Sequence, residues 1–352
     1  MIPLSPKEII IRMARCVLGE ERVHDHLIER GIQLRHLRDG YTENGESRDD
    51  SETRQTLIFM ADGKWMHGGL TDRLRGMASA YKFATEHNLD FKIYHTSPFE
   101  LQKILQPNKV NWIIGEKEIS RNCEVAKPVL LYRIDFKNDS ALERQLDSSH
   151  KQFHLYSCID TVGEEFSKYF NELFKPSPIL EQELSHYGEL LGENYTSISF
   201  RFQNKLGDFK EFTFKELPEK GKRKLMIAAI NVLKKECSLN NEMAIPEQVR
   251  DDSSDANVGH DRKILVTADS PTFLAEVEKL PNVVTVKGKS IHIDFNSSKN
   301  ATDYMKAFTE FFLISKASKA KLYRNRKYKT YPSNFPKYAA LLGHVPYEIV
   351  EE

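Results

Sequence analysis

Residues 67–76, which read HGGLTDRLRG, are the part of this chain whose residue types and spacing best suit binding of a charged ligand. They follow the short apolar run 56–60 and lead into apolar residues at helical spacing, which predicts a strand, a glycine turn and a helix. Gly68 and Gly69 allow backbone angles that other residues avoid, and the free N–H groups at the start of a helix bind anions. We therefore expect an anion-binding turn with Arg73 beside it; the alternative is a tight turn without a ligand.

A second candidate is Arg201, at the end of the apolar and hydroxylic run 196–202. Strand alternation places Ser199 and Arg201 on one face and Phe200 and Phe202 on the other. A guanidinium at the carboxyl end of a parallel strand lies where α/β folds bind ligands, and its planar fork matches two phosphate oxygens. The alternative is an arginine paired with a carboxylate at the strand end.

Residues 263–273 predict a strand that runs directly into a helix. Ser270 is a favourable N-cap, Pro271 suits the first helical position, and Asp269 stands at the tip of the strand. A carboxylate there can accept from the paired N–H donors of a guanine edge or from ribose hydroxyls. The alternative is a second capping or turn-forming residue.

The same pattern returns at 331–343, where Ser333 or Asn334 is expected to cap a helix. The helix dipole and the serine hydroxyl would then face a phosphate. The alternative is a capped terminal helix with Phe335 as an anchor in the core.

Composition limits the classes of protein that the chain can belong to. With 352 residues, 40% of them hydrophobic, two domains are expected. The 51 basic and 51 acidic residues cancel, so no overall field attracts nucleic acid. Four cysteines without CxxC spacing favour reduced thiols, no zinc site and a cytoplasmic location. No signal peptide is evident, and no apolar run approaches the ~18 residues that span a bilayer.

The chain divides into an extension and two α/β domains. Residues 5–32 predict an amphipathic helix that contacts either the membrane surface at its inner face or the protein's own body. Residues 40–53 read as a linker, so residues 1–53 are expected to form a helical extension and linker. Alternating strands and helices over 54–192 and 193–352 predict two Rossmann-like domains that face a cleft. The polar stretch 238–262 is expected to be a mobile surface insertion.

Hydrophobic periodicity gives the elements of the two domains. The expected strands are 56–61, 91–95, 129–135, 153–158, 196–202, 264–267, 283–286 and 321–323. The expected helices are 71–87, 98–105, 163–191 with a break at Pro176 and Pro178, 219–236, 271–280, 302–316 and 336–342.

Taken together and in this order, the four segments resemble the fucosyltransferase superfamily of NodZ, the α1,6-fucosyltransferases and the protein O-fucosyltransferases. The chain is most similar to bacterial relatives associated with surface-polysaccharide synthesis, over about residues 55 to 350. The resemblance implies a GT-B fold and an inverting, metal-independent transfer from GDP-fucose or another nucleotide sugar to a glycan or lipid-linked oligosaccharide. No cofactor is implied.

The resemblance also implies roles for particular residues. The glycine loop of the family corresponds to residues 68–73, and its H-x-R strand to Ser199-Phe-Arg201, with serine where better-known members carry histidine. The Asp-Ser strand tip corresponds to Asp269-Ser270, and the Ser-x-Phe helix start to Ser333-Asn-Phe335, with Asn334 where glycine is common. Arg201 would bind the β-phosphate, Asp269 the guanine, and Ser333 with Phe335 the diphosphate region.

Such a transfer builds negative charge on the departing diphosphate, which Arg201 and helix N-termini would offset without a metal. The acidic run 251–255 lies in the polar insertion and reads as solvated loop rather than a metal motif. Asp72, His67 and Asp208 are candidates for the general base because they flank the predicted cleft. A binding protein of the same fold without turnover is the alternative function, and a dinucleotide oxidoreductase is disfavoured because no G-x-G-x-x-G opens either domain.

Overall fold

The computed structural model describes residues 32, 34–45, 54–131, 140–209, 215–242, 262–295 and 298–352. The helix expected at 5–32, with its membrane contact, and most of the insertion expected at 238–262 lie outside these residues and stay predictions. Among the described helices, none is both long and apolar enough to cross a membrane.

The first half of the chain is built on a four-stranded parallel sheet in the order β2 (Asp90–His95), β1 (Thr56–Ala61), β5 (Gln152–Tyr156) and β4 (Ala126–Leu130). Its helices are α3 (Leu70–Glu86), the short α4 (Ser140–Glu143) and α5 (Phe166–Leu173). The central strands β1 and β5 are almost completely buried, as expected for a parallel sheet that is covered on both faces.

The second half carries a five-stranded parallel sheet in the order β11 (Tyr347–Glu351), β10 (Lys319–Arg324), β7 (Thr196–Phe200), β8 (Ile264–Ala268) and β9 (Val283–Val284). Its helices are α6 (Pro178–Leu191), α7 (Glu219–Glu242), α8 (Pro271–Val277), α9 (Met305–Ile314) and α10 (Phe335–Gly343). The chain moves from β7 outward to β8 and β9, then returns to β10 on the other side of β7. This reversal between β7 and β10 is a topological switch point, where open α/β sheets bind ligands.

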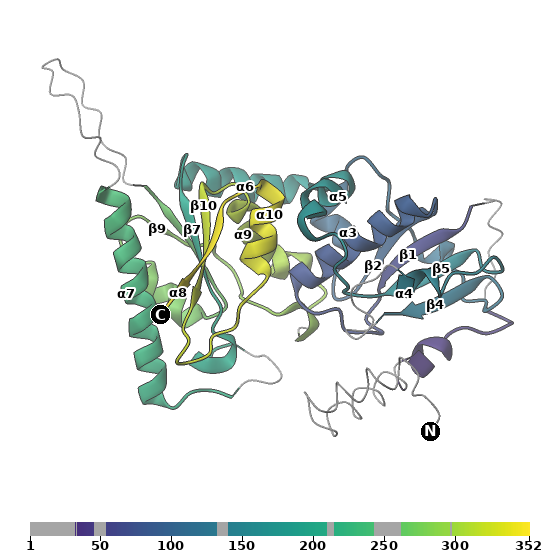
Figure 1. Cartoon of the computed structure of the whole chain (residues 1–352), viewed down its shortest axis with the longest axis horizontal. Helices are drawn as coiled ribbons and strands as arrows, with labels where there is room; N and C mark the ends of the chain where they lie inside the picture. Colours follow the sequence, from purple (N-terminus) through teal and green to yellow (C-terminus); the bar gives the residue numbers. More distant parts are fainter. Residues whose placement is uncertain are drawn as a thin grey trace, which may run out of the picture.

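The two halves share one hydrophobic core. Phe166 of α5 packs edge-on against Phe311 of α9 and Tyr338 of α10, with ring centroids 6.5 and 5.1 Å apart. The Ser167 hydroxyl donates to the Leu342 carbonyl at 2.8 Å, which adds a polar contact to the same junction. Figure 1 shows α5, α9 and α10 between the two sheets. The halves are therefore joined by packed helices as well as by the chain.

The structure confirms the expected α/β class with two parallel sheets, and most of the expected elements, but it corrects several bounds. The helix expected at 98–105 is instead a 3₁₀ turn, η1 (Leu101–Lys103), followed by β3 (Leu105–Pro107), because β3 pairs antiparallel with β6 (Phe174–Pro176). The strand expected at 129–135 lies at 126–130 within the described residues. Helix α7 continues to Glu242, so the expected insertion does not begin at 238. Strand β11 was not expected from the sequence.

The start of the expected linker is fixed to the first half of the chain. The Tyr41 hydroxyl lies 2.6 Å from Nδ1 of buried His154, and Thr42 forms a β-bridge with Asn122. A Cβ on Gly45 would lie 2.3 Å from the Arg121 carbonyl oxygen, so the backbone approaches too closely for any other residue. Residues 41–45 therefore belong to the packed body rather than to a linker.

Candidate functional site

The glycine turn between β1 and α3 has the predicted geometry. Gly68 has φ of +86°, and a Cβ there would lie 2.5 Å from Oδ2 of Asp72, so this position requires glycine. The Gly69 N–H donates to the same Asp72 oxygen at 3.1 Å. The Gly68 N–H donates to Oδ2 of Asp294, which comes from the 3₁₀ turn η6 (Ile293–Phe295) in the second half. The turn therefore binds an anion, and that anion is a carboxylate of the chain itself.

Arg73 completes this anion site. Its Nη2 lies 2.6 Å from Oδ1 of Asp294, and the two side chains are only 5% and 4% exposed. Its Nη1 lies 3.2 Å from His95 Nε2 and 3.3 Å from the Ser97 carbonyl, whereas Nε is buried without a partner among the described residues. Sequence reasoning predicted the anion site but missed Asp294, which lies more than 200 residues away along the chain.

His67 lies beneath the turn rather than on its surface. It is 1% exposed, packs against Phe59 and Trp65, and its Nδ1 lies 3.0 Å from the Ser157 carbonyl. Burial lowers the pKa of His67 well below its ordinary value, and Arg73 adds to this effect, so the ring is neutral. This position corrects the expectation that His67 flanks the cleft and argues against its role as the base.

At the end of β7, Arg201 pairs with Asp269. The alternative expected from the sequence, an arginine paired with a carboxylate at the strand end, is therefore present as a contact. Nη1 of Arg201 lies 2.8 Å from Oδ2 of Asp269, and the Arg201 side chain keeps 19% exposure. Asp269 also accepts from the backbone N–H groups of Phe202 and Gln203, at 2.9 and 2.6 Å. Burial raises the pKa of Asp269 to about 6, although Arg201 opposes this shift. Asp269 thus fixes the turn after β7, and its contact with guanine stays a prediction.

Three further predicted residues hold secondary structure in place. Ser199 is buried between β7 and β8, where its hydroxyl accepts from Thr267 at 2.8 Å. Ser270 is the N-cap of α8 as expected, accepting from the Phe273 N–H at 3.1 Å and donating to Asp208 at 2.6 Å. Asp208 therefore occupies the start of α8 with its own negative charge. This arrangement argues against Asp208 as the base and against α8 as a phosphate site.

The start of α10 matches the sequence prediction. Asn334 is at the N-cap position, and the Ser333 hydroxyl accepts from the Phe335 N–H at 3.2 Å. Phe335 packs against Phe311, with ring centroids 5.5 Å apart, as expected for a core anchor. A phosphate contact of these residues stays a prediction.

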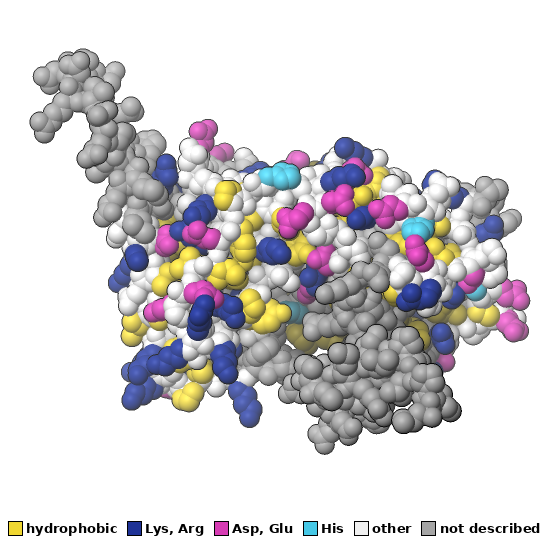
Figure 2. Space-filling view, in the orientation of Figure 1, with side chains coloured by type: hydrophobic (Ala, Val, Ile, Leu, Met, Phe, Trp, Pro, Cys, Tyr) yellow, Lys and Arg dark blue, Asp and Glu magenta, His cyan; other side chains and the backbone are white. Residues whose placement is uncertain are grey.

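A cavity of about 520 Å³ lies at the switch point, next to the segment that leads into α10. This volume is in the usual range for small-molecule sites. Its lining is rich in basic side chains and includes one exposed aromatic ring: Gln203, Arg324, Arg326, Lys329, Thr330, Tyr331, Pro332 and Glu351. Figure 2 shows Lys and Arg side chains gathered at the lower left, over the start of α7 and the loop after β10. Arg324 and Arg326 both pair with Glu351, which also lines the cavity, so an anionic ligand there would have to share or displace that carboxylate.

His292, which sequence reasoning missed, lies beside the glycine turn of the first half. Its Nε2 is 3.8 Å from the position that a Cβ on Gly69 would take, and its Nδ1 is buried without a partner among the described residues. Burial lowers the pKa of His292 to about 4, helped by Arg201 and Arg73 and opposed by Asp72. The only signal in the sequence is a polar His and Asp in the apolar run 291–295.

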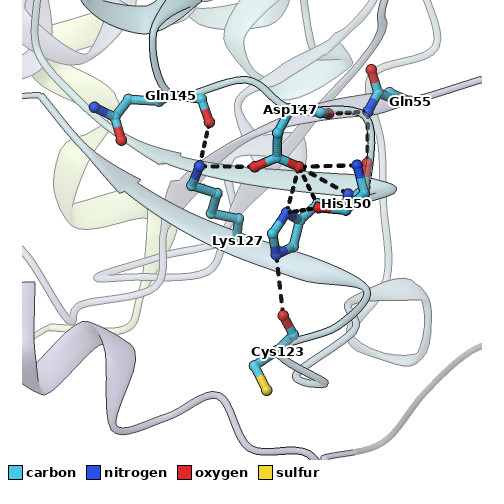
Figure 3. Close-up of polar contacts among 7 residues, drawn as sticks. Gln55, Cys123, Lys127, Gln145, Asp147 and His150 are labelled. Carbon is cyan, nitrogen blue, oxygen red and sulfur yellow. Dashed lines mark hydrogen bonds and ion pairs between the residues drawn. The ribbon is translucent and has the colours of Figure 1, made fainter.

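A polar cluster at the opposite edge of the first sheet is structural. Asp147 accepts from Nζ of Lys127 at 2.9 Å and contacts Nδ1 of His150 at 2.6 Å, while His150 Nε2 lies 3.1 Å from the Cys123 carbonyl (Figure 3). The Cys123 sulfur points away from the ring (Figure 3). Because these groups bond to one another and to backbone carbonyls at the amino ends of β4 and β5, the cluster fixes the turn before β5.

Comparisons with known proteins identify the fold of the chain. No protein-family model matches the chain, and no curated protein matches it. Among solved structures, the chain is similar to fucosyltransferase NodZ from Bradyrhizobium, with 15% identity, a TM-score of 0.50, and coverage of 85% of this chain and 96% of that one. It is also similar to a variant of Arabidopsis thaliana FUT1 in complex with GDP, with 12% identity, a TM-score of 0.52, and coverage of 91% and 74%. The chain thus has the two-domain GT-B fold of these fucosyltransferases.

The described residues contain no group of three or more His, Cys, Asp or Glu side chains placed to hold a metal ion. Metal independence of the reaction stays a prediction that requires an assay.

Proposed function

We propose that this protein is an inverting, metal-independent glycosyltransferase that moves fucose from GDP-fucose to a glycan or lipid-linked acceptor in surface-polysaccharide synthesis. One observation carries the proposal. At the carboxyl ends of the two parallel sheets, His292 lies beside the Gly68–Arg73 turn and its pKa responds to the charge of Arg201, in a fold shared with fucosyltransferases.

The second half is the donor side in this proposal. The switch-point cavity offers the ring of Tyr331 for stacking and basic side chains for phosphate. Gln203 lines the cavity, and its backbone N–H donates to Asp269, which also pairs with Arg201, so a single carboxylate links the lining to that guanidinium. Arg201 would then offset the charge that grows on the diphosphate as the sugar leaves.

The first half is the acceptor side, with Gly68 and Arg73 at its edge. We infer a cytoplasmic enzyme that meets its acceptor at the inner face of the membrane through residues 5–32. Binding of the purified protein to vesicles of anionic lipid, compared with a variant lacking these residues, tests this contact.

The deciding experiment is a screen of the purified protein against GDP-, UDP- and CMP-sugars, with and without polysaccharide acceptors. Release of free nucleotide measures turnover. We expect release from GDP-fucose. We also expect a larger rise of the melting temperature with GDP than with UDP, because in this proposal Asp269 accepts from the donor edge of guanine and ligand binding stabilises the native state. Binding of GDP without turnover with any donor would instead support a catalytically silent binding protein.

A further inference from the structure

The proposed transfer needs a group that accepts the proton of the acceptor hydroxyl, and the residues expected from the sequence are engaged elsewhere. His67 is buried beneath the turn, and Asp208 caps α8. Asp72 pairs with Arg75 at 2.6 Å and accepts from the Gly69 N–H. The base must therefore be sought among groups that reach the junction of the two halves.

We propose that His292 is the general base of the transfer, an inference that rests on the proposed function. Its Nε2 lies 3.8 Å from the position that a Cβ on Gly69 of the acceptor half would take, and its Nδ1 is buried without a partner among the described residues. Burial lowers its pKa, and the positive charge of Arg201 from the donor half lowers it further. Because Gly69 has no side chain, it does not cover the side of the His292 imidazole that faces the turn.

A neighbouring ion pair holds His292 in place. Asp294, two residues further on, binds both Arg73 and the Gly68 N–H. Both contacts are buried, so they fix the segment 291–295 from the second half onto the turn of the first. Asp294 is thus a positioning residue for His292.

The charged groups around His292 make its basicity depend on the donor. Arg201 comes from the end of β7, and Arg73 and Asp72 from the first turn of α3. Without a ligand, burial and the two arginines keep the imidazole neutral. A bound diphosphate brings negative charge to Arg201, offsets its effect and raises the affinity of the imidazole for a proton. The base becomes competent when the donor is in place.

The step balances as a single displacement. The acceptor oxygen forms a bond to the anomeric carbon while the bond from that carbon to the β-phosphate oxygen breaks, and the leaving electron pair stays on the diphosphate. The acceptor proton moves to Nε2 of His292, which becomes an imidazolium beside Asp72 and the diphosphate. The imidazolium then returns its proton to solvent.

The first test compares His292→Gln with His186→Gln, a substitution of an exposed histidine on α6. We expect His292→Gln to lower kcat for transfer by about 10²- to 10⁴-fold and to remove the acid limb of its pH profile, with the GDP-induced melting shift retained. His186→Gln should behave as wild type. Full transfer by His292→Gln in a protein that binds GDP would overturn the base role and leave the proposed function intact.

The second test does not depend on turnover. A pH titration of the His292 ring by NMR, with and without GDP, should show a rise of its pKa by about one unit or more on binding. An unchanged pKa in the GDP complex would overturn the inference. A wild-type protein that neither binds GDP nor releases nucleotide would overturn the proposed function as well.

Discussion

The buried pair of Arg73 and Asp294 gives the sharpest stability prediction. The Arg73 side chain is only 5% exposed, and Asp294→Ala removes the carboxylate that lies 2.6 Å from its guanidinium. The same substitution removes the acceptor of the Gly68 N–H. Breaking a buried ion pair by removing one partner costs about 3–5 kcal/mol, because the remaining charge stays desolvated. We expect a loss of this size in the free energy of unfolding.

Urea unfolding measures this loss, and a double variant separates its cause. Arg73→Met combined with Asp294→Leu removes both charges, so it should recover most of the stability that Asp294→Ala loses. Glu276→Ala, which breaks the exposed pair with Lys279, is the control and should cost less than about 1 kcal/mol. A loss below about 1 kcal/mol for Asp294→Ala would show that the pair is accessible to water and would refute this reasoning.

Four further predictions follow from the same contacts. Gly68→Ala should destabilise the protein by about 1–3 kcal/mol because φ is +86° there. Gly69→Ala should have little effect in thermal unfolding, because φ is −74° and the nearest atoms would lie at ordinary contact distance, 3.8 Å from the new Cβ. Arg201→Lys should lose about a hundredfold to a thousandfold in kcat, almost as much as Arg201→Ala, because lysine lacks the planar fork; near-normal turnover would make Arg201 structural. Exhaustive EDTA treatment should leave turnover intact, and activity that returns only with manganese or magnesium would contradict the metal-free mechanism. Burial raises the pKa of Asp147, but hydrogen bonds from His150, Lys127 and Ser149 outweigh burial and hold the pKa below its ordinary value. The ionised carboxylate therefore stabilises the fold at neutral pH, and this stabilisation is lost as pH falls through the folded pKa. Asp147→Asn should be less stable than wild type at pH 7 in thermal unfolding, with a smaller difference near pH 3.

The sequence predicted those parts of the site that depend on local structure. A strand followed by glycines and a helix is encoded by neighbouring residues, so the turn at Gly68 and the cap at Ser270 could be recognised from their spacing. Arg201 could be placed at a strand end for the same reason. These elements appear in the structure within a few residues of the expected bounds.

The remaining features depend on contacts between distant residues. Asp294 meets Gly68 across more than 200 residues, and Asp269 meets Arg201 across 68, so no local pattern shows that these carboxylates are engaged. His292 lies in a segment without regular periodicity. Strand β11 has a partly exposed, charged sequence that is typical of an edge strand, and β3 forms only because β6 pairs with it.

The core shared by α5, α9 and α10 limits how this protein can be engineered. Either half produced alone would expose the aromatic surface that contains Phe166 or Phe311, and a contiguous apolar patch of that kind promotes aggregation. Chimeras between proteins of this fold should therefore not be cut at the sequence midpoint. Strands β7 and β8 and the loop after β10 can be exchanged, while α9 and α10 should be kept from the same parent as α5.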